Sequence, residues 1–146
     1  MTLRFTTRAR RLSAALLMSS AIGLVMFGQP AQAKPQEREY EAFFASRYNY
    51  CDAKLVGALY GQDVEGGKVI IGQKILNGIG ENVPVVLQES RTQGATCEWE
   101  DTGLSYADAQ TLAETWGFSD PYQAKLKAAD LFTNGREQQV RNGLGA

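Results

Sequence analysis

Apolar residues in the second half of the chain recur with the spacing of one face of an α-helix. They follow one another at intervals of three or four positions, both before Gly117 and across the segment 121–133. A period near 3.6 residues is typical of a helix that buries one side. The pattern predicts two helices, whose inward faces carry Leu112, Ala113, Trp116, Ala124, Ala128, Leu131 and Phe132.

A similar stripe in the first half predicts a helix that ends before Gly61 and buries Cys51, Leu55, Ala58 and Leu59. The segment that follows, 68–76, is ambiguous from its own residues. The pair Gly66-Gly67 weakens a helix start, and the run Val69-Ile70-Ile71 would suit a β-strand equally well. A comparison of the chain with itself favours the helix.

Segment 50–78 aligns with segment 106–135 when one residue is inserted into the second copy, with seven identities in 29 pairs. The shared positions start and end helices, which is what structural repeats retain. Each copy is predicted to form an αα-hairpin, in which a glycine turn joins two helices and an Asn-Gly pair ends the second. The matched positions include Gly61 with Gly117, Lys68 with Lys125, Ile71 with Ala128, Ile75 with Phe132, and Asn77-Gly78 with Asn134-Gly135.

The start of each copy carries the residues of a helix N-cap. Asn49 and Ser105 have side-chain oxygens that accept hydrogen bonds from the first helical turn, whose amides lack partners within the helix. Asp52 and Asp108 follow three positions later, where a carboxylate reaches back to the cap amide and meets the positive end of the helix dipole. We therefore predict two equivalent capping boxes.

Four further segments complete the predicted fold. They are a docking helix over 35–46 with Tyr40, Phe43 and Phe44 on one face, a linking helix over 82–93 with Val85, Val86 and Leu87 facing inward, an irregular stretch over 95–104, and a short helix over 136–144. Together the segments predict an all-α fold. It is a small single-domain helical bundle of short helices, built from two related αα-hairpins and holding one disulfide.

Residues 1–33 have the three-part layout of a cleavable secretory signal peptide. Arginines without any acidic residue precede an apolar run over 12–27, and the small-x-small tripeptide Ala31-Gln32-Ala33 follows Pro30. An uncleaved membrane anchor is the alternative, but the run is shorter than the roughly 20 residues that span a bilayer. We expect export to the periplasm where the cell has an outer membrane, otherwise secretion, and no stable membrane insertion after cleavage.

The mature chain is predicted to consist of a charged, aromatic lead-in helix over 34–47 and a helical domain over 48–144. The leader holds four of the 15 basic residues and none of the 16 acidic ones, which leaves a net charge of −5. An acidic protein does not attract nucleic acid or anionic lipid headgroups, so neither is an expected partner. The chain has no histidine, which removes the commonest general base and zinc ligand.

The chain has two cysteines, Cys51 and Cys97. In an oxidising compartment, an even pair in a small exported domain is most simply one structural disulfide. A redox or metal pair is the alternative, but such a pair needs a Cys-x-x-Cys spacing or further ligands, which the sequence lacks. We therefore predict that a disulfide joins these two residues.

No residue pattern identifies a catalytic centre, a cofactor or a metal site. Glu98, Glu100 and Asp101 offer oxygen ligands that suit calcium, but calcium loops place acids at fixed alternating positions around a glycine. We interpret the three as solvated acids. No acid lies in an apolar sequence context that would raise its pKa for general acid catalysis, so a carboxylate-based hydrolase of the cell envelope is the second alternative only.

Three aromatic residues are candidates for binding. Tyr60 and Trp116 occupy the same position of the repeat, and Trp99 lies near Cys97. If exposed, they would suit a protein partner, because Trp and Tyr are enriched at binding hot spots. The alternative, which we favour for Tyr60 and Trp116, is that they pack between the hairpins.

The leading hypothesis is a non-catalytic binding or interaction module for an unidentified envelope or extracellular protein. The first alternative is a carrier of a small apolar ligand between the hairpins, because helical bundles host such cavities. The absence of a nucleophile–base set favours a role without catalysis. The sequence indicates no oligomeric state.

Overall fold

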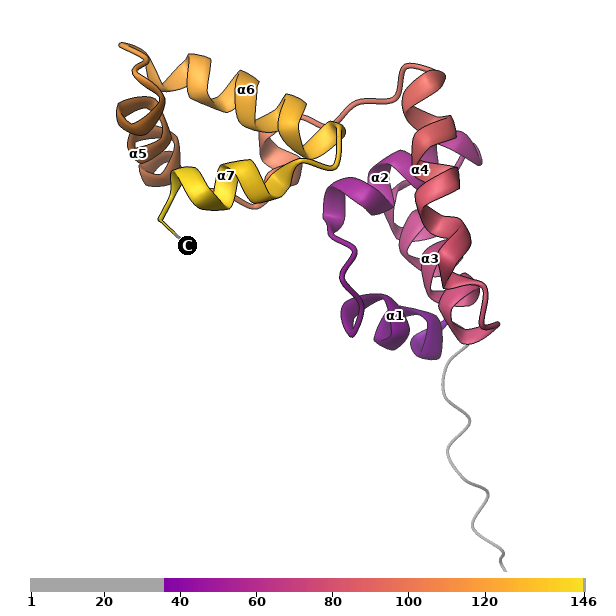
Figure 1. Ribbon diagram of the computed structural model, residues 1–146. Coiled ribbons are helices and arrows are strands. Elements are labelled where there is room, and N and C mark those ends of the chain that lie inside the picture. The colour runs from indigo at the N-terminus through magenta and orange to yellow at the C-terminus, as the bar shows by residue number, and fades with distance from the viewer. Residues whose placement is uncertain (1–35, 146) are drawn as a thin grey trace, which may run out of the picture. The chain divides into compact units, whose positions relative to one another are not determined.

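Every segment in which we predict a helix forms one in the computed structural model, which describes residues 36–145 (Figure 1). The described residues form seven α-helices and two short 3₁₀-helices, and no strand occurs among them. In chain order these are α1 Glu37–Phe44, α2 Tyr50–Leu59, α3 Val64–Leu76, η1 Gly80–Asn82, α4 Val83–Thr92, η2 Trp99–Thr102, α5 Tyr106–Trp116, α6 Pro121–Thr133 and α7 Glu137–Gly143. The predicted leader over 1–33, with its cleavage site, lies outside the described residues.

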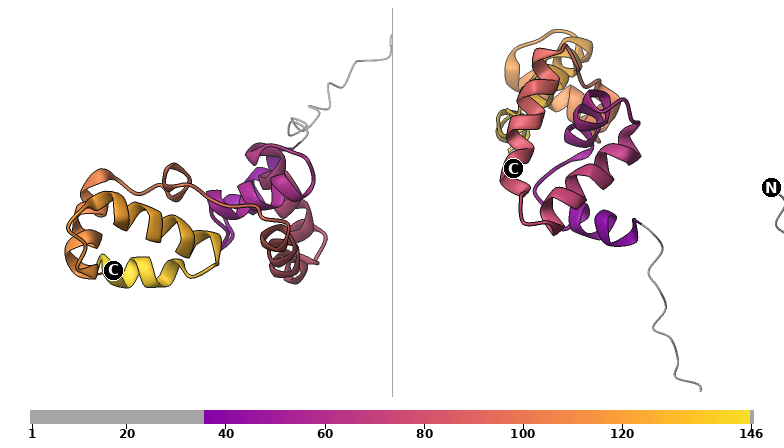
Figure 2. Two further views of the ribbon diagram at one scale, coloured as in Figure 1. Left: turned by 90° about the horizontal axis from the view of Figure 1, so that it is seen from above. Right: turned by 90° about the vertical axis from the view of Figure 1, so that its right-hand side faces the viewer.

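The buried apolar side chains form one hydrophobic core. α2 packs against both α3 and α4, α1 packs against α3, and α5, α6 and α7 contact one another (Figures 1 and 2). α2 also contacts η2 and α6. The prediction of a small all-α domain is confirmed, whereas the internal duplication stays a prediction. The largest fully buried side chains include Leu55, Ile71, Val83, Leu112 and Val140.

The ambiguous segment 68–76 lies within α3 and is a helix, not a strand. The glycines that weaken this helix in isolation allow its neighbours to approach. A methyl group on Gly67 would overlap the carbonyl oxygen of Ala53 in α2, and one on Gly72 would overlap the carbonyl oxygen of Glu39 in α1. Packing against α1 and α2 therefore compensates for the low helix propensity of α3.

Capping boxes start both α2 and α5. The Asn49 side chain accepts a hydrogen bond from the Asp52 N–H (3.0 Å), and the Asp52 carboxylate accepts one from the Asn49 N–H (3.0 Å). Ser105 and Asp108 make the same two bonds in α5, at 3.2 and 2.7 Å. Aspartates also cap the second helix of each copy, a match that the sequence comparison missed: Asp63 for α3 and Asp120 for α6.

A lysine also lies over the first-helix tyrosine in each copy of the predicted repeat. The Nζ atom of Lys68 is 5.1 Å from the centre of the Tyr50 ring, and that of Lys125 is 5.2 Å from the centre of the Tyr106 ring. The two lysines are matched positions of the repeat, and so are the two tyrosines. Duplicated units are expected to share such contacts, so this pair of contacts supports the duplication.

The predicted inward faces of α2 and α4 are partly wrong. Ala58 is exposed and Leu59 is half-buried. The reason is that α2 packs against α3 and α4 at once, which shifts its buried face to Val56 and Gly57. In α4, Val85 is 68% exposed because it lies off the buried stripe. That stripe consists of Val83, Leu87 and Ser90.

The predicted aromatic face of α1 is also divided. Phe43 is buried and Tyr40 is half-buried, but Phe44 is 69% exposed. The Phe44 ring meets the Phe43 ring edge-on, with centroids 5.3 Å apart. The sequence spacing places the three rings near one another, but only part of that face reaches α3.

Candidate functional site

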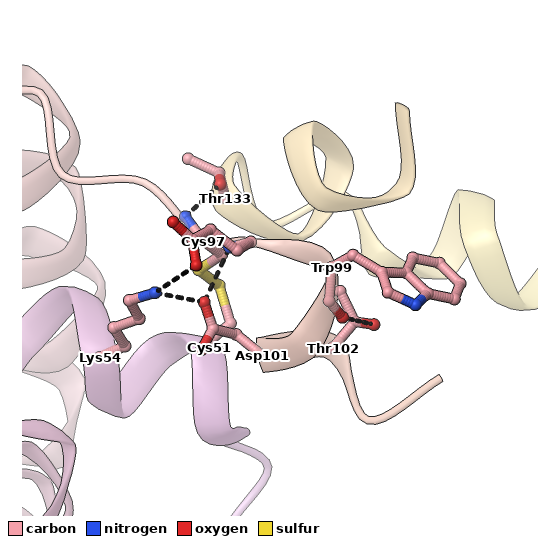
Figure 3. Close-up of polar contacts among 8 residues, drawn as sticks. Cys51, Lys54, Cys97, Trp99, Asp101, Thr102 and Thr133 are labelled. Atoms are coloured by element: carbon pink, nitrogen blue, oxygen red, sulfur yellow. Dashed lines mark hydrogen bonds and ion pairs between the residues drawn. A yellow bond between two sulfur atoms is a disulfide. The ribbon is translucent and has the colours of Figure 1, made fainter. Parts of the chain in front are cut away.

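The disulfide between Cys51 and Cys97 is present, as predicted, and its Cα atoms are 5.7 Å apart. Cys51 lies in the first turn of α2, and Cys97 lies two residues before η2. The Cys97 N–H donates a 2.8 Å hydrogen bond to the Thr133 hydroxyl at the end of α6 (Figure 3). The stretch that leads into η2 is therefore attached to α2 by a covalent bond and to α6 by a hydrogen bond.

An ion pair also links η2 to α2. The Lys54 ammonium donates to the Asp101 carboxylate, and the Asp101 side chain is only 11% exposed. The hydrogen bond to Asp101 raises the pKa of Lys54. Asp101 accepts a further bond from the Glu98 N–H (2.7 Å), which starts η2. The prediction of an irregular stretch over 95–104 is therefore partly wrong, and so is the prediction that Asp101 is solvated.

These links fix the backbone that presents Trp99. Figure 3 shows the Trp99 side chain pointing away from the disulfide. The side chain is half-buried and packs against the edge of the core. The Trp99 carbonyl accepts a 2.6 Å hydrogen bond from the Thr102 hydroxyl, which closes the short helix. Trp99 is therefore held in place by its neighbours on both sides.

A groove of about 480 Å³ lies between this stretch and α6. On the α6 side, Tyr122 is 57% exposed and Leu126 is 50% exposed, although both are large and apolar. With Ala129, seven residues after Tyr122, they form a second apolar stripe of α6 that the sequence analysis missed. The groove is lined by Thr96, Cys97, Glu98, Trp99, Glu100, Tyr122, Lys125, Leu126, Ala129, Asp130 and Thr133.

The other two candidate aromatics lie elsewhere. Tyr60 follows the last residue of α2 and is 48% exposed, so the expectation that it packs between the hairpins is wrong. Trp116 is half-buried and packs against the core, with its ring edge-on to Phe118 at 6.3 Å. The Lys127 ammonium lies 4.3 Å from the Trp116 ring centre. Of the three candidates, Trp99 alone lines the groove.

A smaller pocket, of about 230 Å³, brings two carboxylates together, those of Asp52 and Glu137. Asp52 is buried at 8% exposure, and burial raises its pKa. The sequence places no acid in an apolar context, but packing of the fold buries Asp52 in a way that its sequence neighbours do not indicate. Its carboxylate, however, is engaged in the α2 capping box. The other lining residues are Arg47, Tyr48, Pro84, Leu87, Arg91 and Gly135.

The two capping-box aspartates have pKa values that shift in opposite directions. Burial raises the pKa of Asp52, whereas hydrogen bonds from the Ser105 hydroxyl and N–H lower the pKa of Asp108. A lowered folded-state pKa means that the ionised group stabilises the fold, and this contribution is lost as the pH falls through that pKa. A raised folded-state pKa means that ionisation opposes folding, and this cost disappears below the unfolded-state pKa.

We expect Asp52→Asn and Asp108→Asn to change stability in opposite directions at pH 7. Asp52→Asn should raise the free energy of unfolding, because the amide keeps an acceptor for the Asn49 N–H and removes a buried charge. Asp108→Asn should lower it, because the hydrogen-bonded charge is lost. Both differences should shrink toward about pH 3, where aspartates take up protons. Urea unfolding at the two pH values checks this, and a shift of the same sign for both variants at pH 7 would contradict it.

The residues that the structure describes contain no group of three or more cysteine or acidic side chains that could hold a metal ion. None of the described helices is long and apolar enough to cross a membrane. The chain matches no protein-family model, no curated protein and no solved structure.

Proposed function

We propose that this protein is an exported, non-catalytic binding module that docks a segment of a partner protein in the groove. The exposed apolar side chains of Tyr122 and Leu126 carry the proposal, because apolar surface with a polar rim is typical of interaction sites. The opposite wall, which includes Trp99, is attached to α2 through the disulfide and the Lys54–Asp101 pair. A wall that is already ordered lowers the entropy lost on binding.

A carrier of a small apolar ligand is the second candidate. The groove volume of about 480 Å³ falls in the range of small-molecule pockets. Such pockets, however, bury roughly 70–90% of the surface of a ligand. Tyr122 and Leu126 stay half-exposed, which leaves the α6 wall open to water. This openness favours a partner chain, which brings its own surface to cover the wall.

Export is part of the proposal and has two supports. The leader pattern over 1–33 is that of a secretory signal. The disulfide between Cys51 and Cys97 is typical of proteins that fold in an oxidising compartment. A partner in the envelope or the extracellular space agrees with both.

Leu126→Gln tests the groove. We expect this variant to lose partner binding about tenfold or more, because it places an amide in the apolar wall of the groove. Val85→Gln is the matched control, since Val85 is equally apolar and 68% exposed but lies on α4, outside the groove. Because both positions are exposed, both variants should keep the thermal stability of the wild type.

The measurement is crosslinked capture from an extract of the producing cells, with wild type and both variants compared side by side. The proposal requires one protein species that wild type and Val85→Gln capture and Leu126→Gln does not. Equal capture by all three proteins would contradict it. A small molecule bound to the purified protein in native mass spectra, and lost in Leu126→Gln, would favour the carrier instead.

A further inference from the structure

Acidic side chains surround the groove. Glu98 and Asp130 have side chains that are 73% and 63% exposed, and Glu100 is also exposed. Glu98 lies 3.8 Å from the Lys54 ammonium, and Asp130 lies 3.3 Å from the Arg136 guanidinium, so both are partly balanced. Glu100, by contrast, forms no ion pair among the described residues and is an exposed residue of the groove lining.

Among the described residues that line the groove, Lys125 is the only basic one. Its ammonium lies 5.6 Å from the ring centre of Trp99 and 5.2 Å from that of Tyr106. A cation over aromatic rings interacts with their negative faces, which holds this charge close to the wall. The rim therefore carries three carboxylates, two of them partly paired, and one ammonium, which is engaged by aromatic rings.

We infer that the partner segment carries lysine or arginine beside its apolar residues, an inference that rests on the proposed function. The apolar side chains would contact Trp99, Tyr122 and Leu126, while the basic groups would lie among the rim carboxylates. Charge complementarity of this kind selects partners and speeds their association. The net charge of −5 predicted for the mature chain acts in the same direction, because it repels acidic partners.

Three synthetic amphipathic peptides of equal length test the inference. They share the same leucines and differ only in their polar positions, which are all lysine, all glutamine or all glutamate. Fluorescence anisotropy with labelled peptides measures the dissociation constants. The lysine peptide should bind at least about tenfold more tightly than the glutamate peptide, and added salt should reduce this ratio because it screens charges.

Single-charge variants locate the effect in the groove. Glu100→Gln should weaken binding of the lysine peptide about threefold and leave the glutamine peptide unchanged. Lys125→Met should tighten binding of the lysine peptide, because it removes the one competing positive charge. Glu114→Gln is the matched control, since it removes an exposed acid of α5 outside the groove and should have no effect.

The outcomes separate the inference from the proposed function. If all three peptides bind equally well and Leu126→Gln weakens each of them, the groove binds peptides but charge does not select them, and the inference is wrong. The same holds if Glu114→Gln acts like Glu100→Gln, because net charge and not the rim then controls binding. If no peptide binds and Leu126→Gln captures the same proteins as wild type, the proposed function fails as well.

Discussion

Replacing Gly67 with alanine is expected to lower the free energy of unfolding by about 3 kcal/mol, the upper end of the usual cost of overpacking a core. The added methyl group would overlap the carbonyl oxygen of Ala53, which belongs to the α2 backbone. A side chain could turn away, but a helical backbone moves only as a unit. α2 and α3 would therefore have to separate, which would disturb the core around Leu55 and Ile71.

Gly80→Ala is the matched control for this prediction. A methyl group on Gly80 would lie 3.4 Å from the Ile75 Cγ1 atom, an ordinary van der Waals distance. We expect this variant to stay within about 0.5 kcal/mol of wild type, as surface substitutions usually do. Guanidinium unfolding followed by circular dichroism gives both values. A Gly67→Ala variant as stable as Gly80→Ala would show that α2 and α3 do not approach as closely as the structure indicates.

The same glycine shows why the sequence predicted the helices better than their contacts. Hydrophobic periods and capping residues are local, so they identify the α-helices other than α3 and both predicted capping boxes. Gly67, considered alone, is a weak helix former and helps to make the segment 68–76 ambiguous. Its actual role, close approach to Ala53, depends on a neighbour in space. Periodicity likewise predicted a single buried stripe for α2, which in fact contacts α3 and α4 at once.

The candidate site was predicted only in part, for the same reason. Trp99 was a candidate because of its residue type, but the other wall of the groove lies 23 to 34 residues later in the chain. The stripe that starts at Tyr122 and continues with Leu126 was visible in the sequence as large apolar residues off the main face of α6. Two apolar faces on one helix indicate that the helix contacts more than the core, and this was the signal available.

The charged residues show the same limit. Nothing in the sequence near Asp101 indicates a partner, because Lys54 lies 47 positions earlier. The Cys51–Cys97 disulfide holds the two segments side by side, and the ion pair is a consequence of that. Only the folded arrangement around the disulfide indicates that Lys54 lies beside Asp101. Asp52, one residue after Cys51, is also buried, but in the pocket that Pro84 and Leu87 of α4 line.

Removing the disulfide should destabilise the domain by about 4 kcal/mol, the chain-entropy estimate for a loop of this length. Cys51 and Cys97 are 46 residues apart, and the bond between them joins α2 to the stretch before η2. Without it, the ion pairs of Lys54 with Asp101 and Glu98 and the Cys97–Thr133 hydrogen bond remain as polar links at this place. Each contributes on the order of 1 kcal/mol, too little to replace the bond.

The measurement compares wild type with and without reductant against a Cys51→Ala/Cys97→Ala double variant. Reductant should lower the unfolding midpoint of wild type and leave the double variant unchanged, because that variant has no bond to break. Hydrogen exchange should rise first in residues 95–102, which the disulfide attaches to α2, before it rises in α5. Since this stretch forms one wall of the groove, reduction should also weaken peptide binding while most of the domain is still folded. Unfolding curves of wild type that coincide with and without reductant would show that packing alone holds this wall in place.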